Sequence, residues 1–280
     1  MKDGLNFALI GSPLAHSISP FIHSELFGLK GINGNYSLIE VTKEELEKVY
    51  DNKLKALCGF NVTIPHKINI IPLLDSLEEK AALYSSVNTV KINETGAVGH
   101  NTDCEGFLRS LETADITLGG SVLILGCGGV ARMFAFEALL KGANVTLAVR
   151  KASLEKAERL RGEIKSKLNK DIFITDIDGV GGGYDLIINA TPVGMSPNTG
   201  VSPVKRDVVK ASGAVFDAIY NPGETELLRY AREEGIKHLN GLPMLVIQAA
   251  AAQEIWLDTS FGFDELQGVI SLCEEELKRR

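Results

Sequence analysis

A glycine-rich turn that follows an apolar run constrains the fold of this chain more than any other feature. Residues 121–125 form an apolar strand pattern, and Phe134, Ala135, Ala138 and Leu139 later recur at helical spacing. Between them lie Gly126, Cys127, Gly128, Gly129, Val130 and Ala131. Gly126 would make the tight turn, Gly128 would let backbone approach a pyrophosphate, and small Ala131 would pack helix on strand. A loop without a ligand is the alternative, but the flanking patterns favour a dinucleotide site.

The predicted strand at 144–149 ends where an NAD site would normally carry an acidic residue for the ribose hydroxyls. Arg150 and Lys151 stand there instead. A guanidinium beside an ammonium suits the doubly charged 2′-phosphate of NADP. The alternative is a solvated pair opening the charged helix predicted at 153–167, although basic residues are unfavourable at a helix start. We therefore predict NADP as the cofactor.

Composition bounds the classes of function. A chain of 280 residues with 45% apolar residues suits two domains with ample cores. Its net charge of −7 and lack of a basic run argue against nucleic acid as a partner. The four cysteines lie far apart, which predicts neither a metal site nor disulfides. Met1–Gly4 leads directly into a short strand, and no apolar stretch suits a membrane span, so we expect a soluble cytoplasmic protein.

Strand and helix patterns alternate along the chain, which predicts an α/β fold. Predicted strands lie at 7–10, 36–40, 56–60, 87–92, 172–175, 185–190, 214–217 and 237–239, and predicted helices include 44–51, 76–84, 105–114, 242–257 and 264–278. We expect an N-terminal α/β substrate domain at residues 1–103 and a Rossmann-like, doubly wound nucleotide-binding domain at 104–241. Residues 242–280 should return to the first domain, because the helix at 242–257 is too apolar to stand alone.

Polar side chains cluster in four segments that could line a ligand crevice at the carboxyl ends of strands. Ser17 and Ser19 could bind a carboxylate, although Ser19 before Pro20 is also typical of a helix N-cap. Asn61 and Thr63 share one face by the two-residue strand period, and Lys67 follows, which alone would indicate a surface charge. Asn88 interrupts an apolar strand. Asp103 ends another, and could equally cap the helix after it.

Taken in order, the motifs of this chain resemble those of the shikimate dehydrogenase family. The resemblance covers essentially the whole chain and rests on Ser17-Ile18-Ser19-Pro20, Asn61-Val62-Thr63-Ile64-Pro65-His66-Lys67, Val87-Asn88-Thr89, Asn101-Thr102-Asp103, Gly126-Cys127-Gly128-Gly129, Asn189-Ala190-Thr191, Tyr220-Asn221-Pro222, and Gly241-Leu242-Pro243-Met244-Leu245 through Gln248. It implies NADPH-dependent reduction of 3-dehydroshikimate to shikimate.

The resemblance also implies roles for individual residues. Lys67 and Asp103 would be the catalytic pair. Ser17 and Ser19 would hold the substrate carboxylate with Thr63 and Tyr220, while Asn61, Asn88, Asp103 and Gln248 would bind the ring hydroxyls. Thr191, Gly241 and Met244 would join the glycine-rich turn in the cofactor site, although residues 189–192 are also consistent with a plain turn and Met244 with plain core.

The chain departs from the family pattern at two points. Ser85-Ser86 stands where the family usually has Gly-Ala, and Val149-Arg150-Lys151 stands where it usually has Asn-Arg-Thr. Two other functions stay open. One is a quinate dehydrogenase of dual specificity, since quinate differs mainly by an added hydroxyl, and the other is a non-catalytic sensor that binds dinucleotide. The sequence leaves open whether the protein is a monomer or a homodimer.

Overall fold

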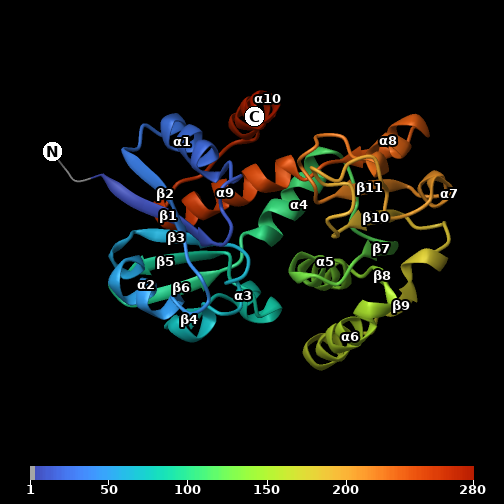
Figure 1. Cartoon of the computed structure of the whole chain (residues 1–280), viewed down its shortest axis with the longest axis horizontal. Coiled ribbons are helices and arrows are strands. Elements are labelled where there is room, and N and C mark those ends of the chain that lie inside the picture. Colours follow the sequence, from blue (N-terminus) through green and yellow to red (C-terminus); the bar gives the residue numbers. More distant parts are fainter. Residues whose placement is uncertain (1–3) are drawn as a thin grey trace. The chain divides into compact units, whose positions relative to one another are not determined.

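The computed structural model describes residues 4–280 and divides them into two compact units. Unit 1 comprises the described residues up to Gly106 together with Leu245–Arg280, and unit 2 comprises Phe107–Met244. Each boundary predicted from the sequence lies three residues before the observed one. The prediction about the start of the chain falls largely on Met1–Asp3, which lie outside the described residues. Figure 1 labels most of the helices and strands of both units.

Unit 1 is built on a mixed sheet with the strand order β2-β1-β3-β5-β6-β4. Its strands are β1 (Leu5–Gly11), β2 (Gly34–Glu40), β3 (Gly59–Val62), β4 (Ser76–Leu77), β5 (Thr89–Asn93) and β6 (Gly96–His100). Its helices are α1 (Ser19–Leu29), α2 (Leu46–Asn52), α3 (Glu79–Tyr84), the start of α4 (Asp103–Thr113), most of α9 (Leu242–Leu257) and α10 (Phe263–Arg279), with short 3-10 turns at Leu54–Ala56 and Ile71–Leu73. Strand β1 pairs in parallel with β2 and β3, whereas β5 runs antiparallel to β3 and β6.

Two apolar layers cover the two faces of this sheet, because successive side chains of a strand point to opposite sides. On one face, Ala8 and Ile10 pack with Leu46 and Tyr50 of α2. On the other, Phe7 packs with Phe27 of α1 and with Ala252 and Trp256 of α9. The Trp256 Nε1 donates to the Val90 carbonyl at 2.9 Å. The apolar helix α9 therefore packs against the N-terminal sheet.

Unit 2 is built on a fully parallel sheet with the strand order β12-β11-β10-β7-β8-β9. Its strands are β7 (Ser121–Leu125), β8 (Asn144–Val149), β9 (Phe173–Asp176), β10 (Leu186–Asn189), β11 (Ala214–Asp217) and β12 (Lys237–Leu239). Its helices are α5 (Gly129–Leu140), α6 (Leu154–Leu168), α7 (Arg206–Lys210) and α8 (Glu226–Glu233), with 3-10 turns at Lys151–Ser153 and Ile177–Gly179. This order confirms the predicted doubly wound sheet, whose direction of winding reverses between β7 and β10.

Helices cover both faces of the parallel sheet (Figure 1). Alternate residues such as Leu123 and Ile187 pack with Val208 of α7 and Leu227 of α8. On the other face, Phe134 of α5 packs between Phe107 and Phe216 with ring centroids 4.4 and 5.7 Å away. Residues 122–125 of the central strand are fully buried. That burial explains their continuous apolar run, which is typical of a strand covered on both faces.

Two predicted elements of unit 1 are wrong in position. The strand expected at 56–60 begins at Gly59, because residues 54–56 form a 3-10 turn. The helix expected at 76–84 begins at Glu79, because Ser76–Leu77 pairs with β6 and the Glu78 carboxylate accepts from the Lys80 N–H at the helix start. Helix α3 ends at Tyr84, and its C-cap, Ser85, adopts the left-handed conformation with φ 48° and ψ 46°. Glycine adopts this conformation most readily, which accounts for the family's preference there.

No helix among residues 4–280 has the length and apolar character needed to cross a bilayer.

Candidate active site

The segment after β1 brings the Ser17 and Ser19 hydroxyls together. Ser17 Oγ donates to Ser19 Oγ at 3.1 Å and accepts from the Ser19 N–H at 3.2 Å. Helix α1 begins at Ser19 itself, with Ile18 at the N-cap, so the interpretation of Ser19 as an N-cap is wrong. Since Ser17 donates to Ser19, the Ser19 hydroxyl hydrogen is left to face a ligand. Both serines are half-buried.

Lys67 and Asp103 form an ion pair, although they come from different segments of unit 1. Lys67 Nζ lies 2.5 Å from Asp103 Oδ2, and the two side chains keep 29% and 16% of their surface exposed. Lys67 follows β3, and Asp103 is the first residue of α4, two positions earlier than the predicted helix start. The interpretation of Lys67 as an isolated surface charge is therefore wrong. A half-buried ammonium held by a carboxylate is suited to moving a proton at a ligand.

Asn88 connects Asp103 to the surrounding side chains. Its Nδ2 donates to Asp103 Oδ1 at 2.8 Å, to Thr102 Oγ1 at 3.0 Å, and over a longer 3.4 Å to Gln248 Oε1. Its Oδ1 accepts from the Thr102 N–H at 2.7 Å and from Thr89 Oγ1 at 3.2 Å. Only 3% of Asn88 is exposed. Each oxygen of the Asp103 carboxylate thus receives a hydrogen bond, one from Lys67 and one from Asn88.

Asn61 joins the same network from β3. Its Nδ2 donates to Thr89 Oγ1 at 2.9 Å and to the Asn88 carbonyl at 3.2 Å, while its Oδ1 accepts from the Tyr36 hydroxyl at 2.7 Å. Thr63 follows the strand and is half-buried. The structure therefore brings Asn61, Asn88, Asp103 and Gln248 into one hydrogen-bonded group. Gln248 keeps a second Nε2 hydrogen after donating to the Leu245 carbonyl at 2.9 Å.

Sequence reasoning missed three members of this group, namely Tyr36, Thr89 and Thr102. Thr89 and Thr102 are nearly completely buried, and their places next to Asn88 and Asp103 inside polar motifs were the signal available in the sequence. Tyr36 sits on the edge strand β2, where an aromatic residue is ordinary. Burial raises the pKa of its hydroxyl well above the usual range, so Tyr36 stays a neutral donor to Asn61.

The glycine-rich turn lies at the carboxyl end of β7, where the winding of the sheet in unit 2 reverses. Gly126 has φ +98°, and a Cβ placed there would lie 2.9 Å from Thr191 Cγ2. A Cβ on Gly128 or Gly129 would meet no atom within 4 Å. The space beside these glycines is thus open to a ligand, whereas Gly126 is required by its backbone conformation.

Helix α5 begins at this turn and is suited to an anion. Its N-cap, Gly128, offers no side chain, and its first turn carries no acidic residue. The N–H groups at such a helix start, together with the helix dipole, favour phosphate. Val130 is half-buried and Ala131 is completely buried, as expected for the residue that packs the helix on the sheet. These residues fit the pyrophosphate of a dinucleotide.

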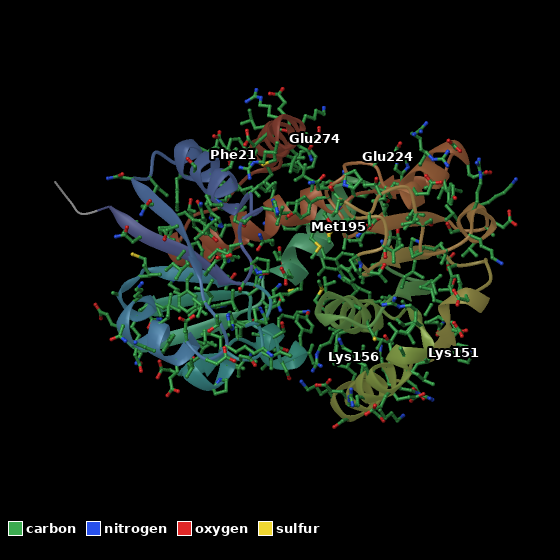
Figure 2. All side chains as sticks on the ribbon, in the orientation of Figure 1. Phe21, Lys151, Lys156, Met195, Glu224 and Glu274 are labelled. Atoms are coloured by element: carbon green, nitrogen blue, oxygen red, sulfur yellow. The ribbon has the colours of Figure 1, made fainter. Side chains whose placement is uncertain are left out.

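Arg150 and Lys151 directly follow β8, as predicted. Both are exposed, and within residues 4–280 neither forms an ion pair. Figure 2 labels Lys151 in this segment, between β8 and α6, and Lys156 within α6. Two unpaired cations beyond the second strand fit a phosphate on the adenosine ribose.

The remaining predicted residues also belong to unit 2, apart from Gln248. Thr191 lies in the turn after β10, where its N–H and hydroxyl both donate to Asn189 Oδ1 at 3.0 and 2.7 Å. Tyr220 follows β11 and is half-buried, so it lies in a different unit from the other proposed substrate contacts. Gly241 lies close to Ala218, whose carbonyl oxygen would be 2.2 Å from a Cβ. Met244 is 8% exposed.

No three acidic, histidine or cysteine side chains of residues 4–280 are grouped so that they could hold a metal ion.

Comparisons with known proteins indicate one family, and the relatives and solved structures given below match nearly the whole chain. A family model described as the shikimate dehydrogenase substrate binding domain matches residues 9–90. A protein of Methanocaldococcus jannaschii named shikimate dehydrogenase (NADP(+)) is 42% identical over 269 residues, covering 94% of each chain. A solved shikimate dehydrogenase in complex with NADP+ has a TM-score of 0.89 at 40% identity, covering 96% of both chains. Shikimate 5-dehydrogenase of Thermus thermophilus, in complex with NADP(H) and shikimate, has a TM-score of 0.85 at 31% identity, covering 96% of this chain and 99% of that chain.

Proposed function

This chain belongs to the shikimate dehydrogenase family, and on that premise we propose that it catalyses the reversible, NADPH-dependent reduction of 3-dehydroshikimate to shikimate. The observation that carries the proposal is the half-buried pair of Lys67 and Asp103. The reaction belongs to the route to chorismate and the aromatic amino acids.

Reduction of a ketone needs one hydride and one proton. NADPH supplies the hydride when it is bound. As negative charge develops on the ketone oxygen, the Lys67 ammonium stabilises that charge and donates a proton to the oxygen, which leaves a hydroxyl on the substrate and a neutral amine on the enzyme. Lys67 is 29% exposed, so water can return the proton. In the reverse direction, the neutral amine accepts the proton from the hydroxyl.

Asp103 holds Lys67 in position and accepts a hydrogen bond from the reacting hydroxyl. Its carboxylate is oriented on both sides, by Lys67 at one oxygen and by Asn88 at the other. A carboxylate fixed in this way costs little reorganisation during the reaction, which is the physical basis of preorganised catalysis.

The substrate carboxylate would be bound by the Ser17 and Ser19 hydroxyls, with help from Thr63 and Tyr220. The ring hydroxyls would be bound by Asn61, Asn88, Asp103 and Gln248. The hydrogen bonds within unit 1 limit how Asn61 and Asn88 can act. Both Asn61 Nδ2 hydrogens have protein partners, so Asn61 can only accept from a substrate hydroxyl. Asn88 can bind substrate only by exchanging a partner, and its 3.4 Å contact with Gln248 is the weakest.

NADP would be held by Gly126, Gly128, Gly129, Val130 and Ala131 at the pyrophosphate and by Arg150 and Lys151 at the 2′-phosphate. Thr191, Gly241 and Met244 would complete the site. The open space at Gly128 and Gly129, the uncapped start of α5 and the unpaired cations after β8 support this assignment.

The test is the initial rate of dinucleotide reduction, followed by NADPH or NADH absorbance, with shikimate and with quinate as substrates and with each cofactor in turn. We expect the highest kcat/KM for shikimate with NADP+. Equal efficiency on quinate would identify a dual-specificity enzyme, and equal efficiency with NAD+ would remove the assigned role of Arg150 and Lys151. Binding of NADP+ without turnover of either substrate would point to a non-catalytic regulator.

We further propose that the enzyme acts in the cytoplasm, which is supported by its four free cysteines. We propose that it acts as a monomer or a homodimer. Light scattering at assay concentrations would distinguish the two states, and a larger assembly would contradict both.

A further inference from the structure

A buried carboxylate in unit 2 has no place in the reaction described above. Asp217 ends β11 and is 0% exposed. Its Oδ1 accepts from Asn189 Nδ2 at 2.9 Å and from the Ile219 N–H at 3.1 Å, and its Oδ2 accepts from Thr225 Oγ1 at 2.6 Å. Within residues 4–280 no cationic side chain pairs with it. A buried charge without a counterion is costly and rare in ordinary cores.

The partners of Asp217 lead to the glycine-rich turn. Asn189 donates to Asp217 through Nδ2 and accepts from both the N–H and the hydroxyl of Thr191 through Oδ1. Thr191 Cγ2 in turn lies where a Cβ on Gly126 would be only 2.9 Å away. A chain of contacts therefore runs from Asp217 through Asn189 to Thr191, which borders the first glycine of the turn.

The same strand end also fixes the segment that enters α9. Ile219, whose N–H bonds to Asp217, accepts from the Gly241 N–H at 3.0 Å. Gly241 itself packs so closely on Ala218 that no side chain would fit. Asp217 is thus connected to the turn after β10, to its own turn after β11 and, through Ile219, to the turn after β12. All three turns lie at the carboxyl edge of the sheet, where ligands of doubly wound folds bind.

We propose that Asp217 is a positioning residue of the cofactor site, which holds Thr191 and Gly241 in the arrangement that NADP needs. This inference rests on the proposed function, because it takes Thr191 and Gly241 as cofactor contacts. An acceptor-only group suits the position, since all three of its partners donate. Burial raises the pKa of this carboxyl to about 6, and the hydrogen bonds from Thr225, Ile219 and Asn189 oppose that rise.

The test is the dissociation constant of NADP+, measured by calorimetry on the full chain without substrate. Asn189→Ala cuts the link between Asp217 and Thr191 and leaves the Asp217 contacts with Ile219 and Thr225 in place. Asp217→Ala removes the centre of the network, and Asp217→Asn keeps an acceptor for Asn189 and Ile219. The matched control is Asp185→Ala, which removes a carboxylate bonded to Ser121 at the opposite end of β10.

We expect Asn189→Ala and Asp217→Ala to weaken NADP+ binding by about tenfold, roughly the effect of one lost hydrogen bond. Asp217→Asn should bind nearly as tightly as the wild type, and Asp185→Ala should bind equally tightly. In steady-state assays the KM for NADP+ should rise, while kcat and the KM for shikimate stay unchanged. A merely structural role would instead lower stability without this separation of constants.

If Asp217→Ala fails to fold, Asn189→Ala alone decides the matter. Wild-type affinity in Asn189→Ala, or equal weakening in Asp185→Ala, would overturn the positioning role of Asp217. A wild-type protein that does not bind NADP+ at all would overturn the proposed function as well, so the two failures are distinguishable.

Discussion

The ionisation of Asp217 should make the stability of this protein depend on pH in an unusual direction. Burial raises the pKa of this carboxyl from 3.8 to about 6, and hydrogen bonds from Thr225, Ile219 and Asn189 only partly oppose the effect. The folded state therefore binds a proton more tightly than the unfolded state does. The stabilisation that protonated Asp217 gives the folded state is fully present below pH 3.8 and is lost as the pH rises through about 6.

The size of the effect follows from the two pKa values. One pKa unit corresponds to about 1.36 kcal/mol, so a rise from 3.8 to about 6 makes ionised Asp217 cost about 3 kcal/mol above that window. Asp217→Asn cannot titrate and escapes this cost. The free energy of unfolding of the variant, minus that of the wild type, should thus increase by about 2.4 kcal/mol between pH 4 and pH 7, because part of the titration lies below pH 4. In thermal unfolding the gap in Tm should widen by roughly 5–10 °C over the same range.

Thermal and urea unfolding of wild type and Asp217→Asn across that range would measure the gap. Asp185→Asn is the control with the opposite sign, because hydrogen bonds from Ser121 lower the pKa of Asp185. Ionised Asp185 stabilises the fold above pH 3.8 and loses that contribution only as the pH falls below this value, so the gap between Asp185→Asn and wild type should stay nearly constant between pH 4 and pH 7. A gap between Asp217→Asn and wild type that stays constant with pH would refute the assignment of a buried, unpaired carboxylate.

Four further outcomes are expected. Lys67→Met should lower kcat by about 10²–10⁴-fold with little change in KM, whereas Lys55→Met, which removes an exposed partner of Asp51, should not. Arg150→Gln should raise the KM for NADPH on the order of tenfold and leave that for NADH unchanged, with exposed Lys156→Gln as the control. Gly126→Ala should destabilise the fold by about 1–2 kcal/mol and weaken NADP+ binding, because φ there is +98°. Burial lowers the pKa of His23 to about 3, so wild type should lose stability relative to His23→Phe as the pH falls below 6.5, measured by urea unfolding.

Most of the strands that could be predicted from the sequence are largely buried, and the edge strand at 237–239 is the exception. The strands at 121–125, 144–149, 214–217 and 237–239 match β7, β8, β11 and β12 residue for residue. Most of them are apolar runs bounded by glycine or charge, which is typical of a strand covered on both faces. Helices α7 and α8 were missed. Helix α8 carries charged residues around a narrow apolar stripe of Leu227, Leu228 and Ala231, and its cap at Thr225 follows a loop without a strong helix signal.

The positions of short elements could not be predicted from the sequence, for a different reason. Strand β4 has only two residues, and its pairing with β6 is decided by tertiary structure rather than by local preference. The strand predicted at 56–60 begins three residues before the observed strand β3, which starts at Gly59. An apolar run without polar alternation does not define where a strand begins. Lys67, Asp103, Asn88 and Asn61 of the hydrogen-bonded group could nevertheless be named from the sequence, because motif order does not depend on where an element begins.

The sequence could not predict which site residues still have hydrogen-bonding capacity for a ligand. Asn61 and Asn88 are equivalent in a motif, but in the structure Asn61 accepts from the Tyr36 hydroxyl, whereas Asn88 donates to the Asp103 carboxylate and accepts from the Thr102 N–H. An asparagine whose bonds all go to protein holds its neighbours in place, and substitution should disturb those neighbours before it disturbs a ligand. Asn88 should therefore affect kcat through the orientation of Asp103. Which residues of a polar site bind the ligand and which orient their neighbours depends on these hydrogen bonds, and they form only once the chain is folded.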